Sequence, residues 1–326
     1  MNQEKKILLF CLLFFIFLSV PTQSHFIITD SSQYGTIVSF SPHEPPIEGE
    51  NSLIQIFLQN TTSFQPFSNL DLVHDRIIHV FIIGEDLKTF AHIHPEDTNI
   101  TEFENKFNSS TVYNSSYYGQ LGYYFVNYTF PKAGKYEVVL DFTINGISVI
   151  KSLQITVRGN DTLSNPVLDF AREKVFSGYN VTLNVINNTA EVGKETELDY
   201  HIEKNGTPVN DLQLYLSSEI HVFLIRDDLT QPGHTHAFVP GHFLHIGNYT
   251  QKYFGPDLPV RWTFTQAGNY VIFGQFQENN TLVTTRFFLK VADNNFPWIY
   301  LAILIFPVFA LAFIFRRNLI GKLKRV

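Results

Sequence analysis

The chain contains almost no sulfur. Its one cysteine, Cys11, lies near the N-terminus, and its one methionine is Met1. Disulfides, catalytic thiols and thioether ligands are therefore excluded from the rest of the chain. A blue-copper centre needs a thiolate and a methionine-rich copper(I) carrier needs thioethers, so both classes are excluded too. Any metal that this protein binds must be held by imidazole and carboxylate groups.

The central part of the sequence also lacks a sustained helical period. Short runs rich in Val, Ile, Phe, Tyr and Thr alternate with polar residues, as in β-strands. Examples are residues 52–58, 136–144, 149–157, 180–186 and 284–291. The 15 prolines and 18 glycines suit the many turns of an all-β protein. The sequence therefore predicts an all-β fold.

Long apolar runs occur only near the two ends. Lys5 and Lys6 precede the first run, 7–20, and a small-x-small cleavage site follows, so residues 1–24 are predicted to be a signal peptide. The second run, 297–315, is long enough to span a bilayer. Five cationic residues follow it in the tail, 316–326, and place the tail in the cytosol. We expect a single-pass type I membrane protein of the secretory pathway.

Glycosylation motifs and the tail refine this localisation. All the N-x-[ST] sequons lie between the predicted signal and the predicted span, as an exposed glycoprotein requires. They are at Asn60, Asn99, Asn108, Asn114, Asn127, Asn160, Asn180, Asn187, Asn205, Asn248 and Asn279. Lys322 and Lys324 resemble a dilysine retrieval signal, which would keep the protein in the endoplasmic reticulum. If they act only as a stop-transfer cluster, the cell surface is expected.

Positive charge is scarce between the ends. The net charge is −7, and seven of the 23 cationic residues but only one of the 30 acidic residues lie in the predicted signal and tail. The expected ectodomain is therefore strongly acidic, and it should repel nucleic acid and anionic lipid while tolerating cations.

A histidine-containing segment occurs twice. Residues 79–95 read HVFIIGEDLKTFAHIHP, and residues 221–236 read HVFLIRDDLTQPGHTH. Both carry H-x-H, whose two imidazoles point to one face of a strand, and one histidine on the strand expected to pair with it. Three imidazoles suit zinc or copper(II). The predicted metal ligands are His79, His92 and His94 in the first copy and His221, His234 and His236 in the second.

A second repeat divides the chain into domains. Residues 127–142 and 261–276 share T-F-x-x-A-G-x-Y, in which Ala-Gly predicts a turn and the tyrosine opens the next strand. Each half therefore has a histidine hairpin followed by a closing hairpin. We predict two tandem β-sandwich domains, 25–157 and 167–293, joined by a polar linker, 158–166.

The first half resembles a bacterial secreted or envelope family with an H-x-H-P hairpin motif. The resemblance rests on His74 to His79, Glu85-Asp86-Leu87, Phe90 and His92-Ile-His94-Pro95, and in the second half on Asp211-Leu212, Tyr215-Leu216 and His221. It implies Ig-like or cupredoxin-like β-sandwiches and an association with copper and heavy-metal handling. Ala237 and Thr265 replace prolines of the family's pattern in the second copy, and the sequons and span indicate a eukaryote-like, anchored version.

Several residues near the hairpins have two readings. His74 faces away from His79 on a regular strand, so we expect it beside the ligands or at the surface. Pro232-Gly233 should bend the second hairpin differently. The site of the second repeat is therefore either rebuilt with loop ligands, for which His242 and His245 are candidates, or degenerate. Of the two sites, we favour that of the first repeat as the working one. Asp86 and Asp228 are expected to cap their own turns, or else to orient a ligand imidazole. A free His25 amino terminus is a further candidate for copper(II).

The function expected from these features is metal binding rather than catalysis. No nucleophile motif of the G-x-S-x-G type appears, so we do not expect an enzyme. We expect a membrane-anchored, glycosylated ectodomain that binds copper(II) or zinc for sequestration, sensing or delivery. The alternative is a metal-free adhesion or receptor ectodomain. The sequence identifies no protein partner.

Overall fold

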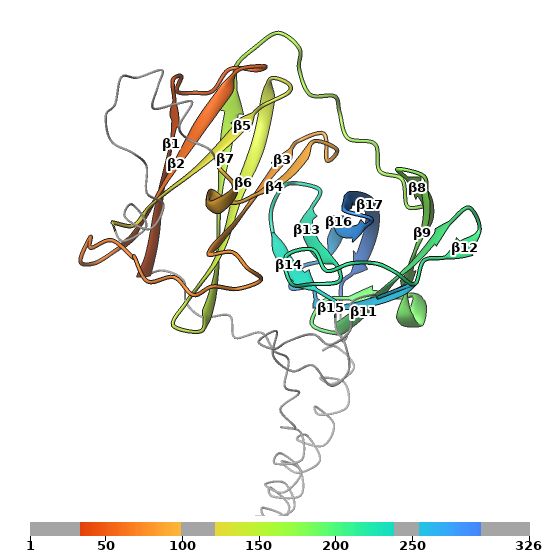
Figure 1. The fold of residues 1–326 in the computed structure, drawn as a ribbon. Helices are drawn as coiled ribbons and strands as arrows, with labels where there is room; N and C mark the ends of the chain where they lie inside the picture. The colour runs from red at the N-terminus through yellow and green to blue at the C-terminus, as the bar shows by residue number, and fades with distance from the viewer. Residues whose placement is uncertain (1–32, 99–120, 238–253, 295–326) are drawn as a thin grey trace, which may run out of the picture.

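The computed structural model describes residues 33–98, 121–237 and 254–294 (Figure 1). The regular structure of these residues is almost entirely β-strand, interrupted by short 3-10 turns such as η2 (Pro95–Asp97) and η3 (Ile186–Asn188). The predicted all-β fold is confirmed. The predicted signal peptide and span lie outside the described residues, and so do His25, His242 and His245. Within the described residues, no helix is long and apolar enough to cross a membrane.

The first half folds into two facing sheets. One has the order β1-β2-β5 and the other the order β4-β3-β6-β7. Their bounds are β1 (Tyr34–Ser41), β2 (Asn51–Asn60), β3 (Ile78–Gly84), β4 (Phe90–Ile93), β5 (Tyr123–Thr129), β6 (Gly134–Ile144) and β7 (Ile147–Val157). Alternate residues of these strands, such as Ile54, Val80, Val126 and Leu140, pack into one core between the sheets.

The second half repeats this arrangement. One sheet has the order β10-β17-β16-β13-β14, and the other has the order β12-β11-β9-β8 with β15 also paired to β11. The bounds are β8 (Glu173–Phe176), β9 (Tyr179–Val185), β10 (Ala190–Glu191), β11 (Glu195–Lys204), β12 (Thr207–Pro208), β13 (His221–Arg226), β14 (Gly233–His236), β15 (Asp257–Thr263), β16 (Gly268–Glu278) and β17 (Thr281–Ala292). A separate core fills this sandwich.

The shared T-F-x-x-A-G-x-Y element forms the same turn in both halves. Gly134 and Gly268 have φ of +140° and +143°, a conformation that favours glycine. The buried Tyr136 and Tyr270 each donate a hydrogen bond from the hydroxyl to a backbone carbonyl four residues earlier, at 2.8 and 2.9 Å. The turn therefore sets where β6 and β16 begin, and it fixes the strands that pair with β3 and β13.

The two sandwiches pack against each other through their histidine-bearing sheets. Every residue of β3 is buried, because its even-numbered side chains fill the first core and its odd-numbered ones face the other domain. Phe81 stacks on Phe223 at 4.4 Å between ring centroids, and Phe90 stacks on Phe273 at 4.1 Å. Figure 1 shows the β3–β4 hairpin beside the β13–β14 hairpin. The apolar interface therefore brings the two repeated hairpins together.

The segment after β7 stays attached to the first domain. Leu163 donates its backbone N–H to Ala133 O, and Ala133 donates to Asp161 O, both at 2.8 Å. The Glu48 carboxylate accepts the N–H groups of Asn160 and Asp161. Backbone hydrogen bonds therefore hold the first part of the predicted linker, 158–166, against the first sandwich.

Candidate metal centre

The first hairpin places its three histidines on one face. Phe81 pairs with His92 and Val80 with Ile93, so the next position opposite His94 is His79. His94 follows β4 and precedes η2. His79 and His94 are buried, with 3% and 2% of their surface exposed. The prediction that H-x-H and a histidine on the paired strand converge is confirmed as geometry.

In each of these three imidazoles, one nitrogen meets a group that accepts a hydrogen bond. His79 Nε2 lies 3.3 Å from Val73 O, His92 Nδ1 lies 2.8 Å from Gln275 Oε1, and His94 Nδ1 lies 2.9 Å from Asp97 Oδ2. The Gln275 amide is oriented because its Nε2 donates to Thr284 Oγ1 at 3.1 Å. A carbonyl, an amide oxygen and a carboxylate only accept. Each of these ring nitrogens therefore carries the proton of a neutral imidazole.

The other three nitrogens consequently carry lone pairs, and they point at one another. His92 Nε2 lies 2.9 Å from His79 Nδ1 and 3.0 Å from His94 Nε2. Without a cation, three lone pairs at these distances repel. Nitrogens bound at 2.0–2.1 Å to a tetrahedral zinc ion are separated by about 3.3 Å, so shifts of only a few tenths of an ångström would admit the metal. The set therefore fits a three-nitrogen metal site.

The three imidazoles of this trio are difficult to protonate, because their pKa values are lowered. Desolvation by burial lowers the pKa of His92 well below its ordinary value, and the neighbouring His94 lowers it further. Desolvation, followed by the charges that His234 and His221 would carry, likewise lowers the pKa of His79 far below its usual range. Burial lowers the pKa of His94 to about 4, although Asp97 opposes the shift. The imidazoles therefore remain neutral at neutral pH and available as ligands.

The second hairpin uses the same register. Phe223 pairs with His234, and His221 pairs with His236. Pro232-Gly233 therefore leaves the histidine register unchanged. The bend itself differs, because Gln231 has φ of 57° and the equivalent Thr89 of the first hairpin does not have a positive φ. His221 Nε2 lies 2.9 Å from Tyr215 O, and His234 Nδ1 lies 2.7 Å from Asp141 Oδ2. Their remaining nitrogens, His221 Nδ1 and His234 Nε2, again carry lone pairs and face each other at 3.2 Å.

Each domain supplies a hydrogen-bond acceptor to the other domain's hairpin. Gln275 on β16 serves His92 of the first repeat, and Asp141 on β6 serves His234 of the second. Asp141 and Gln275 occupy equivalent positions, because they pair with His79 and His221 respectively. The two hairpins are therefore oriented reciprocally across the interface rather than each within its own domain.

All six predicted ligands lie in one cluster, but their grouping differs from the prediction. Among the described residues, three sets of three offer ligand atoms within 4.8 Å of one another: His79 with His92 and His94, His79 with His221 and His234, and His74 with His221 and His236. We call these the first, bridging and mixed trios. The second-repeat histidines thus group with residues of the first repeat, because the domain interface brings the two hairpins into contact.

His74 belongs to this cluster. It is buried, with 8% of its surface exposed, so the surface reading is wrong. Strand alternation misplaced it, because His74 and Asp75 have φ of 51° and 60° and form the turn that Val73 and Arg76 close with paired backbone hydrogen bonds. Its ring stacks on that of His236 at 3.6 Å between centroids.

The acidic residues in the hairpin bends, Asp86 and Asp228, cap their own turns. Asp86 accepts hydrogen bonds from the backbone N–H groups of Lys88 and Thr89, and Asp228 accepts one from Thr230. Turn capping, the expected role of both, is confirmed. The side chains that orient imidazoles are Asp97, Asp141 and Gln275, which the sequence analysis missed. The available signal was the aligned polar positions 141 and 275, which follow the apolar runs 138–140 of β6 and 270–274 of β16.

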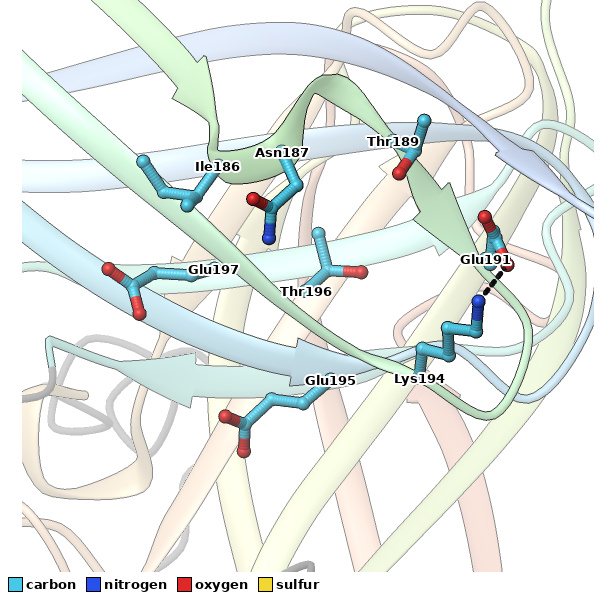
Figure 2. Close-up of a pocket in the computed structure, with 8 residues that line it drawn as sticks. All are labelled: Ile186, Asn187, Thr189, Glu191, Lys194, Glu195, Thr196 and Glu197. Carbon is cyan, nitrogen blue, oxygen red and sulfur yellow. Dashed lines mark ion pairs between the residues drawn. The ribbon is translucent and has the colours of Figure 1, made fainter.

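A cavity of about 390 Å³ opens beside the first trio. His92 and His94 line it together with Asp97 and with Tyr215 of the second domain. A second cavity, of about 380 Å³, is lined by acidic residues of the second domain and contains none of the clustered histidines. Figure 2 shows its Glu191 paired with Lys194. Arg261 lies 3.1 Å from Glu197, as expected of an ordinary charged surface.

The chain belongs to the family described as "Domain of unknown function (DUF8832)", which matches residues 32–159 and 173–293. No curated protein matches the chain. Solved structures with some similarity include the Yersinia pseudotuberculosis adhesin InvE, with 10% identity and a TM-score of 0.22 over 80% of this chain and 61% of that chain. The fibronectin(III)-like modules of Clostridium thermocellum CbhA have 9% identity and a TM-score of 0.18 over 80% of this chain and 96% of that chain.

The native conformation of E. coli alpha-2-macroglobulin has 12% identity and a TM-score of 0.23 over 81% of this chain and 14% of that chain. The chain thus spans less than two thirds of the adhesin and a small part of the macroglobulin. Likenesses this weak add nothing to the fold described above.

Proposed function

We propose that this protein binds a divalent transition-metal ion, copper(II) or zinc, at the first trio, His79, His92 and His94. The observation that carries the proposal is the convergence of three lone-pair nitrogens, with His92 Nε2 at 2.9 and 3.0 Å from the other two. On each ring the other nitrogen faces a hydrogen-bond acceptor. Acceptors on the outer nitrogens are typical of histidine ligands, because they fix the tautomer and increase the basicity of the ligating nitrogen.

The ligand chemistry selects these metals. Neutral imidazole binds zinc and copper(II), whereas calcium and magnesium prefer oxygen. Beyond Cys11 and Met1 the chain offers no thiolate or thioether, so copper(I) has no soft ligand here. The proposal assigns no reaction to the centre.

The cavity beside His92 and His94 supports a role in handling metal. A purely structural zinc site is closed by four protein ligands, whereas a three-nitrogen site that meets a cavity keeps a position open for solvent or an incoming ligand. We propose sequestration, sensing or delivery of the ion on this basis. The resemblance to the bacterial H-x-H-P family agrees with such a role.

We further propose that the centre lies in the secretory pathway or at the cell surface, on a glycosylated type I membrane protein. Glycosidase treatment of the protein expressed in cells should lower its apparent mass, because the sequons are exposed to the lumen in this topology. Protein that passes through the secretory pathway without any glycan would contradict the topology.

The test of metal binding is direct. Purified full-length protein should retain at least one copper(II) or zinc ion per chain after loading and gel filtration, and the metal should raise its melting temperature. His92→Ala combined with His94→Ala should lose an ion and the stabilisation that it provides. His201→Ala is the matched control, because His201 lies on β11 and pairs with Asp257 at 2.6 Å, outside the cluster. If wild type melts at one temperature with and without either metal, the metal-free adhesion alternative is favoured.

A further inference from the structure

The mixed trio shares no residue with the first trio. His74, His221 and His236 offer ligand atoms within 4.8 Å of one another, and none of them belongs to the set His79, His92 and His94. His74 and His221 are buried, with 8% and 2% of their surface exposed. The His236 ring lies 3.6 Å from that of His74 and 4.5 Å from that of His221, between centroids. Two separate sets of three imidazoles therefore occupy one interface.

We infer that His74, His221 and His236 bind a second metal ion, so that the interface holds a two-metal centre. This inference rests on the proposed function of the first trio and extends it to the mixed trio. The second ion is of the same class, zinc or copper(II), because its ligands are again imidazoles. Because His74 comes from the first repeat and the other two from the second, this ion joins the two domains.

The number of imidazoles supports two ions rather than one. A zinc ion takes about four ligands, so a single ion would leave several of the seven clustered histidines uncoordinated. His234 lies between the trios, with its ring 4.9 Å from that of His79 and 4.4 Å from that of His236. Its Nε2 carries a lone pair because Asp141 accepts from Nδ1, so it can complete the coordination of the second ion.

Acidic groups near the cluster offset the charge of two divalent ions. Asp97 and Asp141 accept hydrogen bonds from His94 and His234, which places a carboxylate behind an imidazole on each side. Arg76, which pairs with Asp97 at 2.7 Å, is the cation that partly counters them. Carboxylates at these positions lower the electrostatic cost of placing two cations close together.

The second repeat supplies a substitution that suits the backbone at position 74. Leu216 has φ of 49°, against 51° for His74, and Tyr215 and Ser218 close its turn with the same paired hydrogen bonds. His74→Leu therefore removes one imidazole while keeping a side chain that this turn accepts. It should leave the first trio intact.

The experiment is metal analysis of full-length protein loaded with excess zinc and passed through gel filtration. We expect two zinc ions per chain for wild type, one for His74→Leu and one for His92→Ala combined with His94→Ala. Combining all three substitutions should remove the ions of both trios, and an ion that remains would be held by the bridging trio. His236→Gln is a second route to the loss of the second ion if His74→Leu does not fold, as judged by its near-ultraviolet circular dichroism.

The outcomes separate the two proposals. One ion in wild type, retained in His74→Leu and His236→Gln, overturns the second site and leaves the first standing. Two ions in wild type and two in both variants also overturn it, because the second ion would then lie elsewhere. No ion in wild type overturns the proposed function itself.

Discussion

The two histidine hairpins share one register but differ in their surroundings. Phe81 pairs with His92 as Phe223 pairs with His234, and a backbone carbonyl accepts from Nε2 of both His79 and His221. The first repeat has Asp97 behind His94 and a cavity beside its H-x-H pair, whereas the residues that follow His236 in the second repeat lie outside the described part of the chain. The H-x-H pair of the first hairpin thus meets a cavity, whereas His221 and His236 of the second hairpin group with His74 of the first repeat.

The turn before each hairpin makes the second difference. The first repeat carries His74 in this turn and the second carries Leu216, with nearly the same φ. One additional imidazole at a position already defined by the fold therefore converts six repeated histidines into seven. Duplication of a domain followed by single substitutions at the interface is sufficient to make the two halves unequal.

The largest effect that separates the two hairpins should come from their H-x-H pairs. His92→Ala with His94→Ala removes two of three ligands of the first trio, and we expect its affinity for zinc to fall by more than about 100-fold, beyond the loss typical of removing a hydrogen-bond partner of a ligand. His234→Ala with His236→Ala should leave this tight site in place. Isothermal titration calorimetry on both variants checks this. Equal losses would indicate one site that takes ligands from both H-x-H pairs.

The interface should respond equally to the loss of either stacked phenylalanine. Phe81 and Phe223 are 1% and 2% exposed and stack on each other, so Phe81→Ala and Phe223→Ala should each lower the free energy of unfolding by about 3–5 kcal/mol. Differential scanning calorimetry of metal-free protein measures this. Leu72→Ala is a suitable control, because Leu72 is 68% exposed and should change stability by less than about 0.5 kcal/mol. A large effect at only one of the two phenylalanines would mean that the interface is not symmetric.

Acid should destabilise the metal-free cluster through its buried histidines. The folded-state pKa of His94 is about 4, below the ordinary 6.5, so the unfolded chain takes up the proton first as the pH falls. Stability is therefore complete above pH 6.5 and decreases between 6.5 and 4, at a cost of about 2 kcal/mol for this histidine at about pH 5. Melting temperatures of wild type and His94→Gln should converge as the pH falls from about 7 to 5.

The pKa of His201 shifts in the opposite direction from that of His94, so its effect on stability has the opposite dependence on pH. Its pKa is raised, chiefly by the hydrogen bond to Asp257, so its contribution is present below the ordinary pKa and is lost as the pH rises through the folded value. His201→Gln should therefore lose stability relative to wild type at low pH.

For His94, parallel curves of melting temperature against pH for His94→Gln and wild type would contradict its assignment as a neutral buried group.

The smallest effect should come from exchanging the two acceptors that cross the interface. Asp141→Gln gives His234 the kind of acceptor that Gln275 gives His92, and an amide oxygen still fixes the tautomer. We expect zinc affinity to fall by no more than about tenfold. Asp141→Leu, which removes the acceptor, should cost more. Competition titrations with a zinc chelator distinguish the two, and equal losses would show that the tautomer does not depend on residue 141.

The sequence predicted the strands and the hairpin geometry because both depend on local periodicity. H-V-F-[IL]-I places His79 and His221 opposite the second histidine of each H-x-H, and the structure has that register. The sequence did not predict which histidines of the two repeats group together, because this grouping depends on the contact between two domains that are far apart in the chain. The surface alternative for His74 failed for a local reason, since a two-residue turn with positive φ breaks the alternation of a strand.

X-ray absorption spectroscopy at the metal edge of full-length protein loaded with one equivalent of zinc tests the proposed centre most directly. The first trio predicts at least three nitrogen neighbours at about 2.0–2.1 Å with the outer-shell scattering of imidazole rings. The imidazole scattering should decrease when His92→Ala and His94→Ala are combined with His74→Leu, which removes ligands from both trios, and should not change in His201→Ala. A first shell of oxygen alone, without imidazole scattering, would contradict metal binding by the clustered histidines.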